Sequence, residues 1–98
     1  MSEGPVPPDP SLHRLVTIAN KKGLHARAAA RFVQCAERFE AEITVVKQEI
    51  SVSGRSIMGL LLLAAEPGTE LSLHATGPQA EAALTAIIEL IEGKFGEE

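Results

Sequence analysis

The apolar positions of the chain recur with two periods, and the change between them separates predicted strands from predicted helices. Residues 12–18 alternate, with Val16 and Ile18 on one side, which predicts a β-strand. From Ala26 the apolar residues recur three and four positions apart in an alanine-rich stretch, which predicts an amphipathic helix that ends near Phe39. The buried stripe of this helix is predicted to consist of Ala29, Phe32, Val33 and Ala36.

The second half of the chain returns to short strands and then to helices. The segments 42–47 and 50–53 read as two strands joined by a turn, and 70–76 reads as a further strand with Leu71, Leu73 and Ala75 inward. The apolar run 57–63 is too continuous for its period to decide, but Ser56 as an N-cap and a following Pro-Gly turn favour a short helix. A last helix follows Gly77-Pro78, with a stripe of Ala80, Ala83, Leu84, Ile87 and Ile91.

The predicted order is therefore β-α-β-β-α-β-α. One-sided strands with one-sided helices indicate an α+β fold, an open-faced sandwich with a four-stranded antiparallel sheet and three helices on one face. We expect one domain over residues 12–93, a disordered proline-rich tail over 1–11 and a C-terminal tail over 94–98.

Composition and charge remove several classes of function. The net charge is −4 and the chain has three Phe with no Trp or Tyr, which argues against nucleic-acid binding. There is no signal peptide and no apolar run long enough to cross a membrane, so we expect a cytoplasmic protein. The single Cys35 fits a reducing compartment and is expected to be half-buried.

Candidate chemistry gathers where the first predicted helix begins. His25 would occupy the N-cap, next to backbone N–H groups that have no partner within the helix and form an anion site. Arg27 adds a donor fork suited to phosphate oxygens, so His25 is a candidate phosphoryl acceptor. On the spacing alone, a solvated cap histidine is the favoured interpretation and the phosphoryl acceptor is the alternative. His13 and His74 are expected at the surface, and the separation of the three histidines argues against a metal site.

A second segment of interest is the stretch "GRSIMGLLLL". Ile57 and Met58 either point outward as an apolar docking patch or belong to the core, and the sequence does not separate these alternatives. Phosphorylation of Ser56 would place negative charge at the rim of such a patch.

The stretches "GLHARAAARFV" and "GRSIMGLLLLAAEPGTELSLHATG", in this element order, resemble the histidine-containing phosphocarrier (HPr) family of the bacterial phosphotransferase system. The resemblance covers residues 12–93 and implies the open-faced sandwich fold. It implies that His25 is phosphorylated on Nδ1, that Arg27 binds the phosphate, and that the backbone N–H groups of Ala26 and Arg27 hold it. It implies no cofactor and no metal. The last helix and its flanks look most like the nitrogen-related branch.

The resemblance also implies partners. Enzyme I would donate the phosphoryl group and an enzyme IIA domain would accept it, so that the chain is a stoichiometric carrier and not an enzyme. Ser56 matches a serine that a dedicated kinase modifies and a phosphorylase restores, and regulated target enzymes would be further partners. A monomer is expected. The implied docking surface consists of Leu24, Ala30, Ile57, Met58 and Leu61.

Two departures and two alternatives accompany this interpretation. Ala28 stands where the family usually has proline, and the absence of proline should loosen the first helical turn and alter the transfer rate. Lys22 stands where some members carry a small polar residue. One alternative is a regulatory module that acts on target enzymes by docking, without obligatory phosphotransfer. The other is a ligand- or nucleic-acid-binding α+β domain, which the charge and the few aromatics disfavour.

Overall fold

The computed structural model describes residues 12–97 and contains the predicted elements in the predicted order. Their bounds are β1 Leu12–Thr17, α1 Ala26–Ala36, β2 Glu42–Lys47, β3 Ile50–Ser53, α2 Ile57–Leu62, β4 Glu70–Thr76, α3 Ala80–Glu92 and the 3₁₀ turn η1 Lys94–Gly96. The prediction that the first helix ends near Phe39 was wrong by three residues. The N–H groups of Arg38 and Phe39 donate to the carbonyls three residues earlier, at 3.2 Å each, so the α-helix gives way to a tighter turn.

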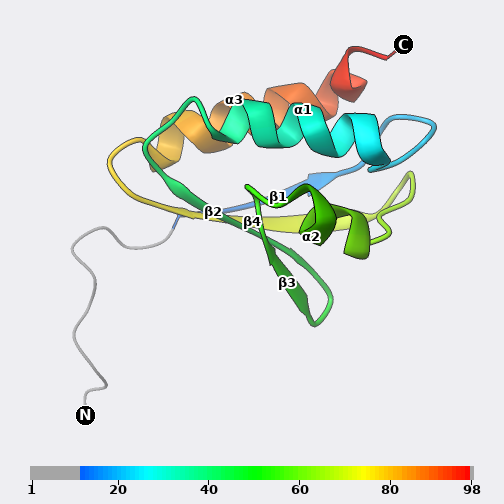
Figure 1. The fold of residues 1–98 in the computed structure, drawn as a ribbon, viewed down its shortest axis with the longest axis horizontal. Helices are drawn as coiled ribbons and strands as arrows, with labels where there is room; N and C mark the ends of the chain where they lie inside the picture. Colours follow the sequence, from blue (N-terminus) through cyan, green and yellow to red (C-terminus); the bar gives the residue numbers. More distant parts are fainter. Residues whose placement is uncertain (1–11, 98) are drawn as a thin grey trace.

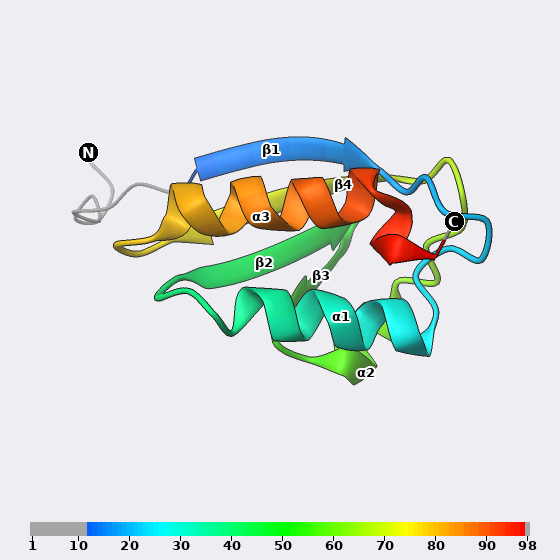
Figure 2. The same ribbon diagram turned by 90° about the horizontal axis from the view of Figure 1, so that it is seen from above.

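The four strands form one antiparallel sheet in the order β1-β4-β2-β3. Helices α1 and α3 lie side by side across one face of this sheet, and α2 packs against α1 and β3 (Figures 1 and 2). The opposite face stays open, and Leu15 on β1 is 57% exposed there. The predicted α+β open-faced sandwich is thereby confirmed.

The core lies between the sheet and the helices, and its residues are those that the periodicity selects. On β4 the alternation places Leu71, Leu73 and Ala75 inward, and all three are buried. The predicted stripes of α1 and α3 are buried in full. Phe32 of α1 is among the largest fully buried side chains. None of the helices within residues 12–97 is long and apolar enough to cross a membrane.

The C-terminal segment differs from the expected tail. Phe95, in the turn η1, is 1% exposed and belongs to the core, and the Arg31 guanidinium on α1 donates to its backbone carbonyl. Residues 94–97 therefore pack on the domain instead of leaving it, because a buried phenyl ring fixes the turn. The tail expected over residues 1–11 lies outside the described residues.

A close backbone approach positions the loop that precedes α1. Gly23 has a positive φ of 70°, and a Cβ at this position would lie 2.5 Å from the carbonyl oxygen of Ala65. The same carbonyl accepts the N–H of Leu24 at 2.9 Å. The loop is thus held against the backbone at Ala65, in the segment between α2 and β4, and its path into α1 requires glycine.

We predict that Gly23→Ala lowers the free energy of unfolding by about 3 kcal/mol, since it combines a left-handed conformation with overlap against the Ala65 carbonyl. Gly68→Ala is the matched control, because Gly68 also has a positive φ, of 88°, but a Cβ there meets nothing within 4 Å. Gly68→Ala should lower the free energy of unfolding by only roughly 1–2 kcal/mol, which is the cost of the left-handed backbone conformation without any overlap. Urea denaturation of both variants measures the difference, and equal losses would contradict the role of the close approach.

Candidate functional site

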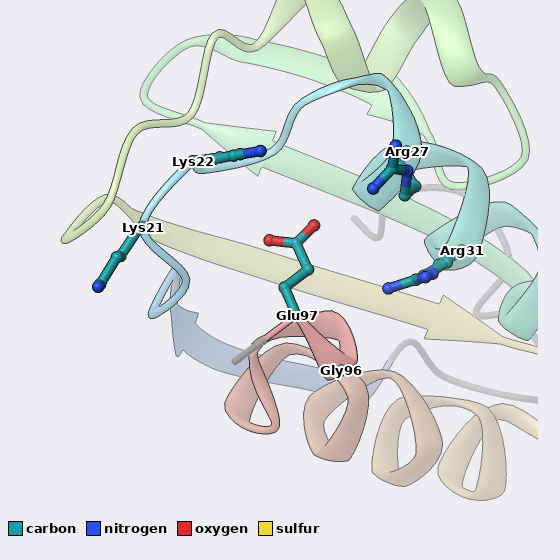
Figure 3. A pocket seen from close by; sticks show the side chains of 6 residues that line it. All are labelled: Lys21, Lys22, Arg27, Arg31, Gly96 and Glu97. Carbon is teal, nitrogen blue, oxygen red and sulfur yellow. The ribbon is translucent and has the colours of Figure 1, made fainter.

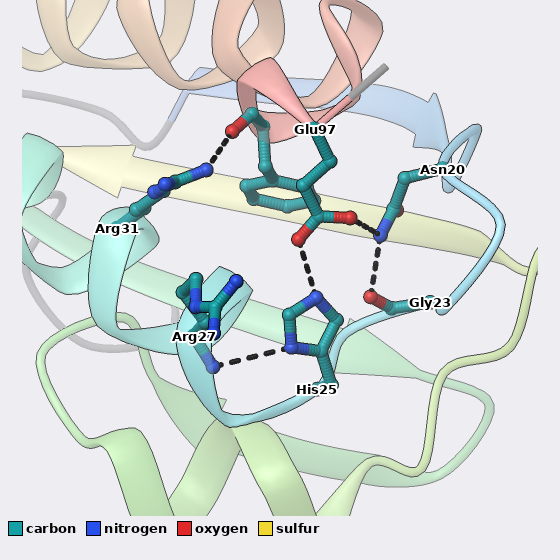
Figure 4. Close-up of polar contacts among 7 residues, drawn as sticks. Asn20, Gly23, His25, Arg27, Arg31 and Glu97 are labelled. Carbon is teal, nitrogen blue, oxygen red and sulfur yellow. Dashed lines mark hydrogen bonds and ion pairs between the residues drawn. The ribbon is translucent and has the colours of Figure 1, made fainter.

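His25 caps the N-terminus of α1, as predicted. Its backbone is extended, with φ −81° and ψ −179°, and its carbonyl accepts the N–H of Ala29 at 2.8 Å. Its Nδ1 accepts the backbone N–H of Arg27 at 3.2 Å (Figure 4). The side chain keeps 26% of its surface exposed, so the ring is held at the helix end without being enclosed.

The other ring nitrogen of His25 faces a carboxylate. Nε2 contacts the Glu97 carboxylate in a hydrogen-bonded ion-pair geometry, across 72 residues of sequence (Figure 4). In a neutral imidazole one nitrogen donates and the other accepts. Because Nδ1 accepts from Arg27, the proton belongs on Nε2, where it points at Glu97.

A buried asparagine holds the carboxylate in place. The Asn20 side chain, 0% exposed, donates from Nδ2 to Glu97 at 3.0 Å and to the Gly23 carbonyl at 2.7 Å. Desolvation alone would raise the pKa of the Glu97 carboxyl, but opposing interactions outweigh it, chiefly the hydrogen bonds from Asn20 and His25. The pKa of Glu97 therefore lies below the ordinary value for glutamate, and the carboxyl stays ionised near neutral pH.

A basic pocket of about 440 Å³ opens beside this network. Lys22, Arg27 and Arg31 point toward the space around the Glu97 carboxylate, while Lys21 and Gly96 complete the lining (Figure 3). Arg27 and Arg31 are four residues apart and so lie on one face of α1. Several cations beside a partly exposed imidazole can stabilise an incoming anion such as a phosphoryl group.

The predicted backbone donors are in place at this helix end. Ala26 and Arg27 are the first two residues of α1, where the N–H groups have no carbonyl one turn earlier in the helix. Ala28, which stands in the usual proline position, is fully buried, and α1 still begins at Ala26. The helix start thus does not depend on a proline.

The predicted docking residues divide into two groups. Met58 is 71% and Ile57 40% exposed, whereas Ala30 and Leu61 are half-buried. Leu24 is only 5% exposed and packs into the core, so its place in a docking surface has to be corrected. Leu62, which the predicted docking surface does not include, is 71% exposed. We call Ile57, Met58 and Leu62 the apolar α2 patch.

Ser56 caps α2, as predicted. Its Oγ accepts the N–H of Gly59 at 2.9 Å, and its backbone is extended with φ −115°. The side chain is half-buried at the edge of the apolar α2 patch. A group attached to Ser56 would therefore lie directly beside Ile57.

The remaining candidate residues lie apart from this site. His13 and His74 stack with ring centroids 4.6 Å apart, and both Nε2 atoms reach Ser72 Oγ, at 2.6 and 3.0 Å. Among residues 12–97 no group of three or more His, Cys, Asp or Glu side chains is placed to hold a metal ion. Cys35 is half-buried, and burial raises the pKa of its thiol despite the nearby charge of Arg38.

Sequence reasoning missed three residues of the network around His25. Asn20 lies in the polar turn "ANKKG", where an amide could have been suspected of bracing the loop. Arg31 falls one turn after Arg27, which is a detectable spacing. No sequence pattern around Glu97 indicates a contact with His25, because it is the burial of Phe95 that brings Glu97 to the ring.

Comparison with known proteins identifies the family. The sequence profile described as "PTS HPr component phosphorylation site" matches residues 12–93. The phosphocarrier protein HPr of Pseudomonas aeruginosa is 49% identical over 83 residues, which cover 84% of this chain and 92% of that protein. The phosphocarrier protein NPr of Shewanella violacea is 48% identical over 86 residues, covering 88% and 94%.

A solved structure supports the same assignment. HPr-C-His from Thermoanaerobacter tengcongensis matches with a TM-score of 0.85 at 45% identity, over 89% of this chain and 98% of that one. The match thus extends from sequence to fold over nearly all described residues. The chain belongs to the HPr family of phosphocarrier proteins of the phosphotransferase system.

Proposed function

We propose that the chain carries a phosphoryl group on Nδ1 of His25, accepted from enzyme I and passed to a histidine of an enzyme IIA domain. The observation that carries this proposal is the cap geometry. The Nδ1 lone pair points at the N-terminus of α1, 3.2 Å from the Arg27 N–H, on a ring that solvent and partners can reach. The chain would act as a stoichiometric carrier in the cytoplasm, with no metal or cofactor, and as a monomer.

The transfer is a displacement at phosphorus. The Nδ1 lone pair forms the new N–P bond while the bond from phosphorus to the donor's histidine breaks, and that electron pair returns to the donor's imidazole. The Arg27 N–H is released from Nδ1 and can bind a phosphoryl oxygen, together with the N–H of Ala26 and the Arg27 guanidinium. Return transfer to the acceptor reverses these steps, so the site has to stay shallow.

The apolar α2 patch is the proposed docking surface for both partners. Met58 and Leu62 are the most exposed large apolar side chains among residues 12–97, and α2 packs against α1, whose first turn carries the site. Exposed apolar side chains of this kind mark protein–protein contacts, and Met suits more than one partner. Ala30 of α1 and Leu61 of α2, both half-buried, complete the proposed docking surface.

Phosphorylation of Ser56 by a serine kinase is the proposed regulation. It would add close to two negative charges at the rim of the docking surface. These charges would weaken docking, because they repel an acidic partner surface and lose their hydration against an apolar one. Removal by a phosphorylase would restore docking.

We assign the chain to the nitrogen-related branch, in which regulation of target enzymes accompanies or replaces sugar transport. The likeness of the last helix and its flanking residues to that branch motivates this assignment; overall identity does not separate the branches, because the HPr of Pseudomonas aeruginosa is 49% identical and the NPr of Shewanella violacea 48%. A second candidate function, a docking module without obligatory phosphotransfer, draws on the exposed apolar α2 patch. A His25→Ala variant that still regulates its target enzyme would favour it.

Incubation with enzyme I, phosphoenolpyruvate and magnesium should add one acid-labile phosphate, read by intact mass. His25→Ala should gain none, because it lacks the accepting nitrogen, while His74→Ala, a matched removal of imidazole from the sheet, should gain one. Arg27→Ala should slow acceptance about tenfold to a hundredfold, as loss of a charged hydrogen bond implies. A folded wild type that gains no phosphate from an active donor would overturn the carrier function.

Met58→Asp should raise the concentration of the chain that half-saturates phospho-enzyme I by about tenfold, since docking would bury an unpaired charge. Leu15→Asp is the control, because Leu15 is 57% exposed on the open face of the sheet, away from the helices. Rapid-quench transfer assays at varied chain concentration measure this. An equal effect of both substitutions would exclude α2 as the specific docking element.

Ser56→Asp should raise the same half-saturating concentration, because its charge enters the rim of the apolar α2 patch. Ser53→Asp provides the control, since Ser53 is exposed on β3 outside the patch. Circular dichroism checks that both variants fold. Unimpaired docking of Ser56→Asp would argue against regulation through this residue.

A further inference from the structure

The contact between Glu97 and His25 is built by several independent interactions. Burial of Phe95 anchors the turn η1, and Arg31 holds the Phe95 carbonyl. Asn20 then fixes one carboxylate oxygen of Glu97 at 3.0 Å, which leaves the other to meet Nε2 of His25 (Figure 4). The Glu97 side chain is only 14% exposed, so this is an ordered carboxylate and not a free surface side chain.

The two nitrogens of His25 therefore have assigned roles. Nδ1 accepts from Arg27, so Nε2 carries the proton and donates it to Glu97. The opposite tautomer would set two donors against each other at Nδ1 and leave Nε2 facing a carboxylate without a proton. The surroundings thus keep the lone pair on the nitrogen at the helix N-terminus.

The His25 ring gains positive charge during phosphoryl transfer, and the Glu97 carboxylate is placed to stabilise that charge. When Nδ1 forms its bond to phosphorus, the ring keeps its Nε2 proton and gains positive charge, while the donor's imidazole takes up the electron pair of the broken bond. A carboxylate hydrogen-bonded to Nε2–H stabilises that charge more than it stabilises the neutral ring. No proton has to move, and the carboxylate keeps the ring plane aimed at the donor.

We propose that Glu97 is a positioning residue for phosphotransfer, which holds the proton on Nε2 of His25 and stabilises the ring as Nδ1 accepts the phosphoryl group. This inference rests on the proposed role of His25 and adds to it a carboxylate supplied by the C-terminal turn. Glu97 touches neither phosphorus nor donor. Asn20 does not contact the His25 ring in this role; it orients the Glu97 carboxylate through the hydrogen bond from its Nδ2.

The test uses two substitutions and one control in the full chain. Glu97→Gln removes the charge and keeps an oxygen acceptor, and Glu97→Ala removes both. Glu92→Gln is the matched control, because it removes the same charge from an exposed position at the end of α3. Single-turnover transfer from phospho-enzyme I at varied chain concentration separates the maximal rate from the half-saturating concentration.

We expect Glu97→Gln to lower the maximal rate by about three- to tenfold and Glu97→Ala to lower it further, at unchanged half-saturating concentration. The effect is smaller than the full strength of a charged hydrogen bond because solvent reaches the pair. Glu92→Gln should match the wild type. An unchanged maximal rate in both Glu97 variants, a change confined to half-saturation, or faster transfer would each overturn the proposal, the last by showing that the carboxylate repels the incoming group.

A second measurement does not depend on transfer. In nitrogen-15 NMR spectra of the imidazole, wild type should show the His25 proton on Nε2 in slow exchange with water, and Glu97→Ala should lose that signal to exchange. An Nε2–H that exchanges equally fast in both proteins would overturn the proposed contact. If the wild type accepted no phosphate at all, the carrier function would fail, and this NMR comparison would still decide the role of Glu97 toward the ring.

Discussion

The approach of Gly23 to the backbone of Ala65 is the constraint on which the site depends. A side chain at residue 23 would overlap the Ala65 carbonyl, and the same carbonyl binds the N–H of Leu24. This contact fixes the position of the loop between β1 and α1, so that His25 lies at the N-cap of α1. The orientation of the imidazole, the accepting role of Nδ1 and the reach of Nε2 toward Glu97 all follow from that placement.

The site joins two opposed requirements. A phosphoryl group needs cations and ordered donors, which Arg27, Arg31 and the start of α1 provide. A carrier also has to present the group to two proteins in turn, so the ring cannot be enclosed. The sandwich meets both requirements, because the ordered groups come from the helix end and the packed C-terminal turn while the outer side of the ring stays open.

The features that the sequence predicts correctly depend on short-range patterns, namely the spacing of apolar residues and the residues that precede each helix. The alternation of β4 and the stripes of α1 and α3 determine which side chains are buried, and the cap roles of His25 and Ser56 are decided within three residues of sequence. Leu24 was misassigned to the surface because a single apolar loop residue has no period. Phe95 and Glu97 escaped prediction because their environment comes from α1 and the Asn20 loop, more than sixty residues earlier, and no short-range pattern encodes such a contact.

The packed C-terminal turn has a practical consequence for handling the protein. Any peptide fused after residue 98 would join the chain next to Glu97, where it could pull η1 from the core or compete for the basic pocket. A fusion partner placed before Leu12 would instead join the end of β1 remote from the His25 loop (Figure 2). Affinity tags, fluorophores and immobilisation chemistry therefore belong at the amino end, and kinetic comparisons between differently tagged preparations of such a carrier would otherwise report on the tag.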